Sequence, residues 1–167
     1  MGAVATEEES RKGVNDMAEY TAVAEQTVAM NQPVVFTETV IPCRAGLINH
    51  YDGTGLFTLA GIQGDSCGCP CCQANDPEYF AHFHANIAIP TGGAAGEISL
   101  AMQIGGVTIP ASQMTVTPTV LNAYFNVGTA GSVPVFGNCC QNLAVVNISS
   151  SNQAILVRNA RIRIGLN

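Results

Sequence analysis

From residue 25 to residue 164 the chain is a succession of short runs in which apolar and polar residues alternate, separated by Gly, Pro and Asn. A period of two is typical of β-strands with one face in a core and the other in solvent. Residues 98–104 show this period, and the Gly105-Gly106 pair that follows predicts a hairpin into the next run. We count about eight to ten such strands, which predicts an all-β fold, a sandwich or jelly roll.

Two longer runs suggest which aromatic residues lie inside. Residues 79–89 and 121–127 both alternate, and in these registers Phe83 and Phe125 face the core. The runs 143–148 and 155–157 are instead apolar at consecutive positions. A strand of that kind must be covered on both faces, once by its own core and once by another element or molecule.

Charge is scarce and unevenly distributed. Charged residues make up 11% of the chain, against roughly 25% in an average globular protein. Six of the 12 acidic residues lie within the first 25 positions, and the rest of the chain has a net charge of about −2. A monomer with so few charges would be poorly protected against association. We therefore expect an oligomer that buries apolar faces.

The same composition argues against two classes of partner. The chain as a whole is acidic, with a formal net charge of −6, which opposes electrostatic capture of nucleic acid. No apolar run approaches the ~20 residues that a membrane helix needs. We therefore expect no nucleic-acid partner and no membrane partner.

Residues 1–22 differ from the remainder in composition. They are rich in charge and poor in apolar side chains, so alone they bury too little surface to fold. We predict an N-terminal arm over residues 1–22, either disordered or ordered by a partner, followed by one domain over residues 23–167. The residues that we expect to anchor this arm are Glu7, Glu8, Arg11, Lys12 and Tyr20.

The order of the motifs resembles the C1q/TNF-like jelly roll. The segments that carry the likeness are Gln26–Phe36, Ile48–Leu59, Tyr79–Ile89, Ile98–Gly106 and Leu143–Ile164. The chain is most similar to the bacterial and phage branch, which comprises C-terminal domains of collagen-like spore-surface proteins and virion surface proteins of phages. The resemblance implies a ten-stranded sandwich of two sheets that forms a homotrimer around a three-fold axis through one sheet.

Seven cysteines form the densest chemical feature of the chain. Thiolates bind zinc or iron–sulfur clusters, but only Cys69 and Cys72 have a usual zinc spacing. The alternatives are disulfides, which we favour, or reduced thiols that pack as small apolar groups. Since seven is odd, at least one thiol is free or bonded between subunits. The cysteines are Cys43, Cys67, Cys69, Cys71, Cys72, Cys139 and Cys140, of which the four from Cys67 to Cys72 lie in a segment that departs from the family pattern.

The histidines offer a second candidate metal site. His82 and His84 share one face of the strand predicted over residues 79–89, and a cysteine or Asp52 would provide a third ligand. The simpler interpretation, which we prefer, is that both histidines lie on the solvent-facing or trimer-facing side of that strand. Asp52-Gly53 is typical of a turn.

Arg158, Arg161 and Arg163 form a basic cluster near the C-terminus. In a trimer they could surround the axis and bind an anion or a carboxylate such as that of Glu97. Equally, they could protect an exposed strand edge with charge. The sequence has no G-x-S-x-G motif, and its histidines cannot be placed in a catalytic triad. We expect no enzyme, no catalytic residues and no cofactor.

These observations favour a structural protein of the virion, a capsid decoration or head-fibre trimer of a tailed phage. Its arm would bind the major capsid protein, and its β domain would stand on the capsid surface and could contact a host glycan. One alternative is a trimeric adhesin, secreted or on the spore (exosporium) or cell surface, although this sequence has no collagen-like stalk before the domain. The other is a metal-binding protein or enzyme that uses the cysteines and histidines.

Overall fold

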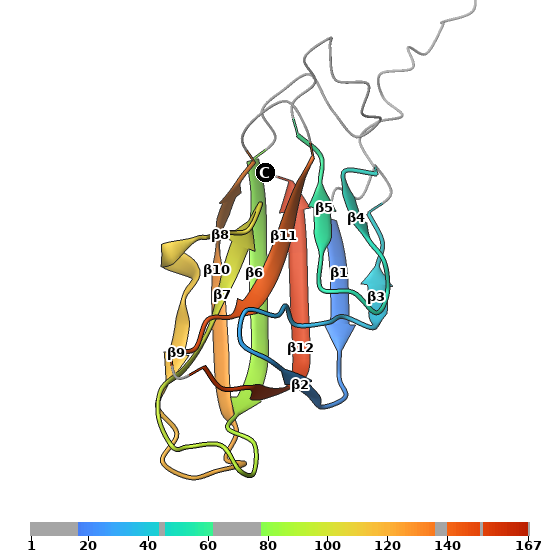
Figure 1. Cartoon of the computed structure of the whole chain (residues 1–167). Helices are drawn as coiled ribbons and strands as arrows, with labels where there is room; N and C mark the ends of the chain where they lie inside the picture. The colour runs from blue at the N-terminus through green and yellow to red at the C-terminus, as the bar shows by residue number, and fades with distance from the viewer. Residues whose placement is uncertain (1–16, 44–45, 62–77, 136–139, 151, 167) are drawn as a thin grey trace, which may run out of the picture.

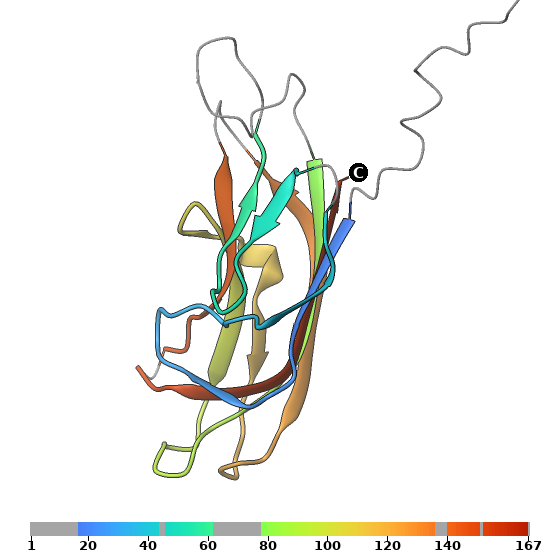
Figure 2. The same ribbon diagram turned by 90° about the vertical axis from the view of Figure 1, so that its right-hand side faces the viewer.

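The computed structural model describes residues 17–43, 46–61, 78–135, 140–150 and 152–166, and its strands form two antiparallel sheets (Figure 1). Figure 2 shows the two layers facing each other. The first sheet has the order β10-β6-β12-β1-β3, with β2 also paired to β12: β1 (Met17–Ala22), β2 (Gln26–Val28), β3 (Glu38–Ile41), β6 (Glu78–Ala88), β10 (Phe125–Pro134) and β12 (Ile155–Leu166). The second sheet has the order β4-β5-β11-β7-β8, with β9 also paired to β7: β4 (Ile48–His50), β5 (Phe57–Leu59), β7 (Ile98–Ile104), β8 (Val107–Thr108), β9 (Met114–Val116) and β11 (Gln141–Asn147).

The predicted all-β sandwich is confirmed, with twelve strands in the described residues instead of about ten. The twelve include segments of only two or three residues, such as β2, β8 and β9. Between β8 and β9 the described chain forms one turn of 3-10 helix, Pro110–Ser112. Among the residues that the structure describes, no helix has both the length and the hydropathy of a membrane-spanning segment.

Two local predictions are confirmed by the strand pattern. In β6 the residues from Tyr79 to Ile87 alternate strictly, and every second side chain, including that of Phe83, is buried. The β7–β8 hairpin turns at Gly105 and Gly106, whose φ angles are 57° and 82°. Positive φ at both central residues of a two-residue turn matches the right-handed twist of the strands, and glycine adopts it without strain.

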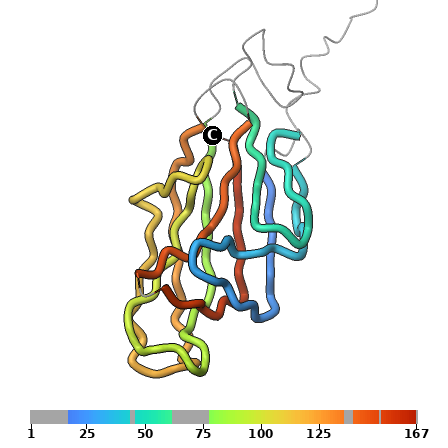
Figure 3. Tube along the Cα trace, viewed as in Figure 1, coloured from blue at the N-terminus to red at the C-terminus, as the bar shows by residue number. Residues whose placement is uncertain are grey.

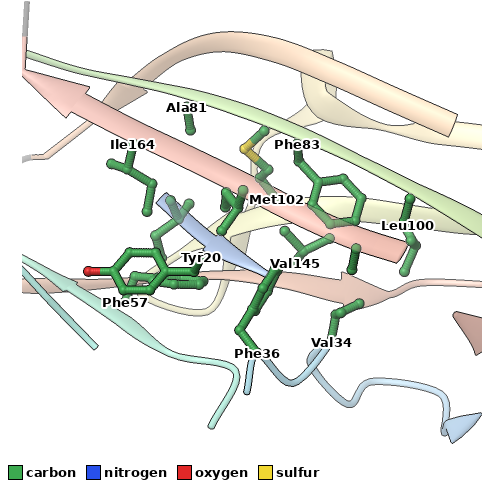
Figure 4. Close-up of a cluster of buried hydrophobic side chains, with 14 of the residues drawn as sticks. Tyr20, Val34, Phe36, Phe57, Ala81, Phe83, Leu100, Met102, Val145 and Ile164 are labelled. Atoms are coloured by element: carbon green, nitrogen blue, oxygen red, sulfur yellow. The ribbon is translucent and has the colours of Figure 1, made fainter. Parts of the chain in front are cut away.

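The core lies between the sheets and is centred on aromatic rings (Figure 4). Phe36, Phe57 and Phe83 are fully buried, and the Phe36 centroid lies 5.1 Å from that of Phe57 and 6.5 Å from that of Phe83. The Tyr20 ring from β1 packs 4.9 Å from Phe57 of the opposite sheet. Edge-to-face and tilted pairs of this kind join the two layers.

One polar group is built into the end of this core. The chain leaves β2 in the first sheet and then runs beside β11 of the second, with a backbone bond of 2.8 Å from the Val34 N–H to the Val145 carbonyl (Figure 3). Asn147 is fully buried at this crossing, as we predicted for its strand. Its Nδ2 donates to the carbonyls of Val28 and Gln153, and its Oδ1 accepts from Ser149.

The strand predicted over residues 121–127 begins only at Phe125. Asn122 adopts a left-handed φ of 57° and its N–H bonds to the carbonyl of Ile89, so the chain turns there instead of extending. Phe125 therefore lies at the end of β10 and is 39% exposed. The expectation that it is a core residue was wrong.

The predicted boundary between arm and domain also needs correction. Met17–Ala22, which we assigned to the arm, is strand β1, hydrogen-bonded between β12 and β3. Tyr20 is only 2% exposed in the core, so it cannot be an anchoring residue on a free arm. The folded domain therefore begins at or before residue 17, and the remaining predicted anchors, Glu7, Glu8, Arg11 and Lys12, lie outside the described residues.

Candidate functional site

The outer face of the first sheet, the side that points away from the core, collects most of the chemistry of the domain. Because β1, β12, β6 and β10 are neighbours in fixed antiparallel register, their outward residues line up in rows across the strands. The rows are Met17–Gly165–Phe80–Ser132, Glu19–Arg163–His82–Ala130, Thr21–Arg161–His84–Gly128 and Arg158–Asn86–Asn126. One end of the face carries the exposed ring of Phe80 beside Glu78, which accepts a hydrogen bond from Ser132 at 3.0 Å, and the middle of the face is charged.

Glu19 is the centre of the charged rows. Its Oε1 lies 2.6 Å from Nη2 of Arg161, and its Oε2 accepts from Nη2 and Nε of Arg163 at 2.7 and 3.0 Å. The Glu19 side chain is only 5% exposed, whereas those of the two arginines are 42% and 46% exposed. The arginines therefore cover the carboxylate and still present part of their guanidinium groups to the surface.

The protonation states follow from this contact. The hydrogen bond from Arg161 lowers the pKa of Glu19 from 4.5, and burial opposes this effect without cancelling it. The same hydrogen bond raises the pKa of Arg161. The carboxylate is therefore charged across the neutral range and neutralises one of the two arginines.

His82 and His84 lie beside the arginines, on one face of β6 as predicted, with ring centroids 5.8 Å apart. Together with Arg161 and Arg163 they line a hollow of about 120 Å³, which we call the basic pocket. Burial lowers the pKa of His84 from 6.5, and the charges of His82 and Arg161 act in the same direction. His84 therefore favours its neutral form near neutral pH.

The structure separates the third arginine from this group. The Arg158 guanidinium lies 3.6 Å above the ring of Tyr124, whose hydroxyl donates to Glu25. The carboxylate that Arg161 and Arg163 bind is that of Glu19, whereas we had suggested Glu97. We missed Glu19 because it lies 144 residues from Arg163 and within the predicted arm. The alternating Ala18, Tyr20 and Ala22 are the signal that could have identified its strand.

The metal-site hypothesis gains no support from the described residues. Within them no group of three or more His, Cys, Asp or Glu side chains could hold a metal ion. Asp52, our suggested third ligand for His82 and His84, accepts a hydrogen bond from Thr39 at 2.8 Å, next to the predicted turn at Gly53. The third histidine, His50, stacks its ring on that of Phe57, with the two ring centroids 4.5 Å apart.

The structure describes two of the seven cysteines. Cys43 is a half-buried free thiol that packs against the core, and Cys140 takes part in a disulfide. The remaining cysteines lie outside the described residues: Cys67, Cys69, Cys71, Cys72 and Cys139.

The apolar part of the outer face has the composition of a contact surface. Phe80 on β6 is 43% exposed, although its neighbours along the strand, Tyr79 and Ala81, are fully buried. The adjacent strand β10 presents only small outward residues beside the pocket, Gly128 and Ala130. An exposed aromatic side chain next to a flat strip of small residues is suited to close packing against another protein surface.

A second hollow, of about 400 Å³, lies on the outer side of the second sheet. Pro33, Leu56 and Val146 provide apolar surface, and Gln103 and Asn142 provide amides. The predicted host glycan stays a prediction.

Comparison with solved structures identifies the fold. The chain is similar to the globular domain of zebrafish complement 1qA protein, with a TM-score of 0.59 and 12% identity over 91% of this chain and 97% of that chain. It is also similar to the Eiger TNF from S. frugiperda, with a TM-score of 0.64 and 9% identity over 92% and 93% of the two chains. No family model and no curated protein matches the sequence. The predicted C1q/TNF-like jelly roll is therefore confirmed as a fold.

Proposed function

We propose that this domain forms a homotrimer through the outer face of the first sheet and serves as a capsid decoration or head-fibre protein of a tailed phage. The observation that carries the proposal is the composition of that face. Of its acids, Glu19 is already neutralised within the chain and Glu78 accepts a hydrogen bond from Ser132, while Phe80 and the small residues of β10 are left uncovered. A C1q/TNF-like fold fits a trimeric domain of this kind.

The scarcity of charge supports the same conclusion. Outside the first 25 residues the chain carries only six acids and four arginines. The row at Phe80 and Met17 therefore has few charged neighbours that would keep copies apart, one of which is Glu78, two residues from Phe80 on β6. Association would bury this row and leave the second sheet exposed to solvent.

The virion role extends the resemblance that the order of the sequence motifs suggests, and it assigns a mechanical task to the protein. Residues 1–16 would hold each subunit on the major capsid protein, and three such arms on one trimer would bind with avidity. The β domain would then form a resistant outer surface. No step of this role requires catalysis or a cofactor.

The trimer is tested by sedimentation velocity and native mass spectrometry of wild type, Phe80→Ala and Tyr51→Ala. Tyr51 is a matched control because it is an exposed aromatic residue, 80% exposed, in the turn between β4 and β5 of the other sheet. Because an interface aromatic is lost, Phe80→Ala should raise the dissociation constant of the trimer roughly tenfold or more. Tyr51→Ala should leave that constant unchanged. A monomeric wild type, or equal effects of the two substitutions, would contradict the proposed interface.

The arm is tested separately by deleting residues 1–16 and measuring cosedimentation with capsids. The deletion should stop at residue 16, because removing Met17–Ala22 would take an interior strand out of the first sheet. The shortened protein should still form trimers and should no longer bind capsids. A truncated trimer that binds capsids as well as wild type would exclude the arm as the anchor, and a trimer without capsid affinity at full length would favour an adhesin.

A further inference from the structure

The basic pocket is the most unusual electrostatic feature of the described chain. Four nitrogen-bearing side chains from two neighbouring strands line it, with Arg161 directly opposite His84 and Arg163 directly opposite His82 in the β6–β12 register. Such a group would repel itself unless a negative charge were close by. Glu19 supplies one such charge, to both arginines at once.

The charges in the pocket do not balance. Two arginines against one carboxylate leave one positive charge when both histidines are neutral, and protonation of either histidine increases it. The other side chains that face the pocket from adjacent strands are uncharged: Thr21 on β1, Asn86 on β6, and Gly128 and Ala130 on β10. Glu38 on β3 lies one strand farther away and is close to Thr21 instead.

The donors are held in place before any ligand arrives. Glu19 takes one N–H of Arg161 and two of Arg163, and each guanidinium has five N–H donors. The two planar groups are thus fixed by the buried carboxylate while several donors of each stay free. Preorganised guanidinium groups bind oxyanions with paired, charge-assisted hydrogen bonds.

We propose that the basic pocket between His82, His84, Arg161 and Arg163 binds a small tetrahedral oxyanion such as phosphate or sulfate. A hollow of about 120 Å³ has room for several waters, and therefore for a five-atom oxyanion. The anion neutralises the remaining positive charge and accepts hydrogen bonds from both arginines and from the histidine rings. The site lies on the face that we propose for the trimer contact, but all four side chains belong to one subunit, so a single copy contains the whole site.

Binding is coupled to protonation. A bound anion raises the pKa of His84, opposing the burial and the neighbouring positive charges that lower it. The protein therefore takes up protons when the anion binds, and affinity increases as the pH falls from neutral toward the pKa of His84.

The test is titration calorimetry of the full-length protein with sodium phosphate and sodium sulfate, against sodium chloride at equal ionic strength. We expect saturable binding of both oxyanions at one site per chain, and for sulfate, whose own charge does not change over this range, an affinity that increases as the pH is lowered. Arg163→Gln and His84→Gln should each weaken it by roughly tenfold or more. Arg158→Gln is the matched control, because it removes the same charge from the same strand at a residue that stacks on Tyr124 outside the pocket.

Thermal unfolding of each variant in chloride shows that it is folded, and sedimentation of the same samples gives the oligomeric state. Phe80→Ala should bind the anion normally even where it dissociates the trimer, so failure of the trimer and failure of the site give different results. Heat signals that do not saturate or that chloride reproduces would overturn the proposal. Binding that survives in Arg163→Gln, or that is lost equally in Arg158→Gln, would do the same.

Discussion

Replacing Glu19 by Gln tests how the outer face is held together. Glutamine has the same size but no charge, so the two ion pairs with Arg161 and Arg163 are lost. Hydrogen bonds to charged groups are worth about 1.5–3 kcal/mol when buried, and exposed ion pairs about 0–1 kcal/mol. Here the carboxylate is 5% exposed and the arginines are nearly half exposed. We therefore expect Glu19→Gln to reduce the free energy of unfolding by about 1–3 kcal/mol in total.

Urea denaturation in chloride buffer measures this loss, and its pH dependence tests the cause. The pKa of Glu19 is lowered in the folded state, so its contribution is fully present above pH 4.5 and disappears as the pH falls through the folded-state pKa. Wild type and variant should therefore converge in acid. Glu38→Gln is the control, because Glu38 is exposed on β3 with only a 3.4 Å contact to Thr21. A difference that persists in acid, or an equal loss in the control, would refute the reasoning.

Three further predictions concern the core and the pocket. Phe83→Ala should reduce the free energy of unfolding by about 3–5 kcal/mol, because the ring is fully buried. Phe125→Ala, at a side chain that is 39% exposed, should reduce it by less than half as much. Chemical denaturation compares the two variants, and equal losses would contradict the assigned strand facing. Asn147→Asp removes the two Nδ2 donors and leaves the carbonyls of Val28 and Gln153 without them. Thermal denaturation should therefore show that the free energy of unfolding falls by about 3 kcal/mol or more. The control Asn49→Asp, at an exposed amide, should lower it by under about 1 kcal/mol. The lowered pKa of His84 means that its neutral form stabilises the fold above pH 6.5 and that this contribution is lost as the pH falls below 6.5. A denaturation series in chloride should show this loss of stability in acid for wild type and a smaller loss for His84→Gln. Identical pH profiles of the two proteins would exclude this contribution of His84.

Much of the local structure could be predicted from the chain itself. The alternation around Phe83 predicted both the strand β6 and its buried face, and Gly105-Gly106 predicted the β7–β8 hairpin. Both depend on contacts between residues close in sequence, and side chains that alternate in a strand alternate in burial wherever one face meets a core. The shared face of His82 and His84 followed from the same rule.

The errors lie where local pattern and long-range pairing disagree. The run around Phe125 alternates, but the left-handed turn at Asn122 shortens the strand and leaves the ring half in solvent. The charged composition of the first 22 residues concealed β1, whose hydrogen-bonding partners in β12 are more than 130 residues away. A charged residue such as Glu19 is stable there only because two arginines from that distant strand meet it.

By itself, then, the sequence determined the all-β class, the buried face of β6, the hairpin turn and the shortage of charge. Those properties follow from a period of two, from turn residues and from composition, none of which needs knowledge of distant neighbours. Only the tertiary structure decided that β1 lies beside β12 and β12 beside β6. That order brings Glu19, the arginines and the histidines into one pocket, because strand register joins residues that sequence distance keeps apart.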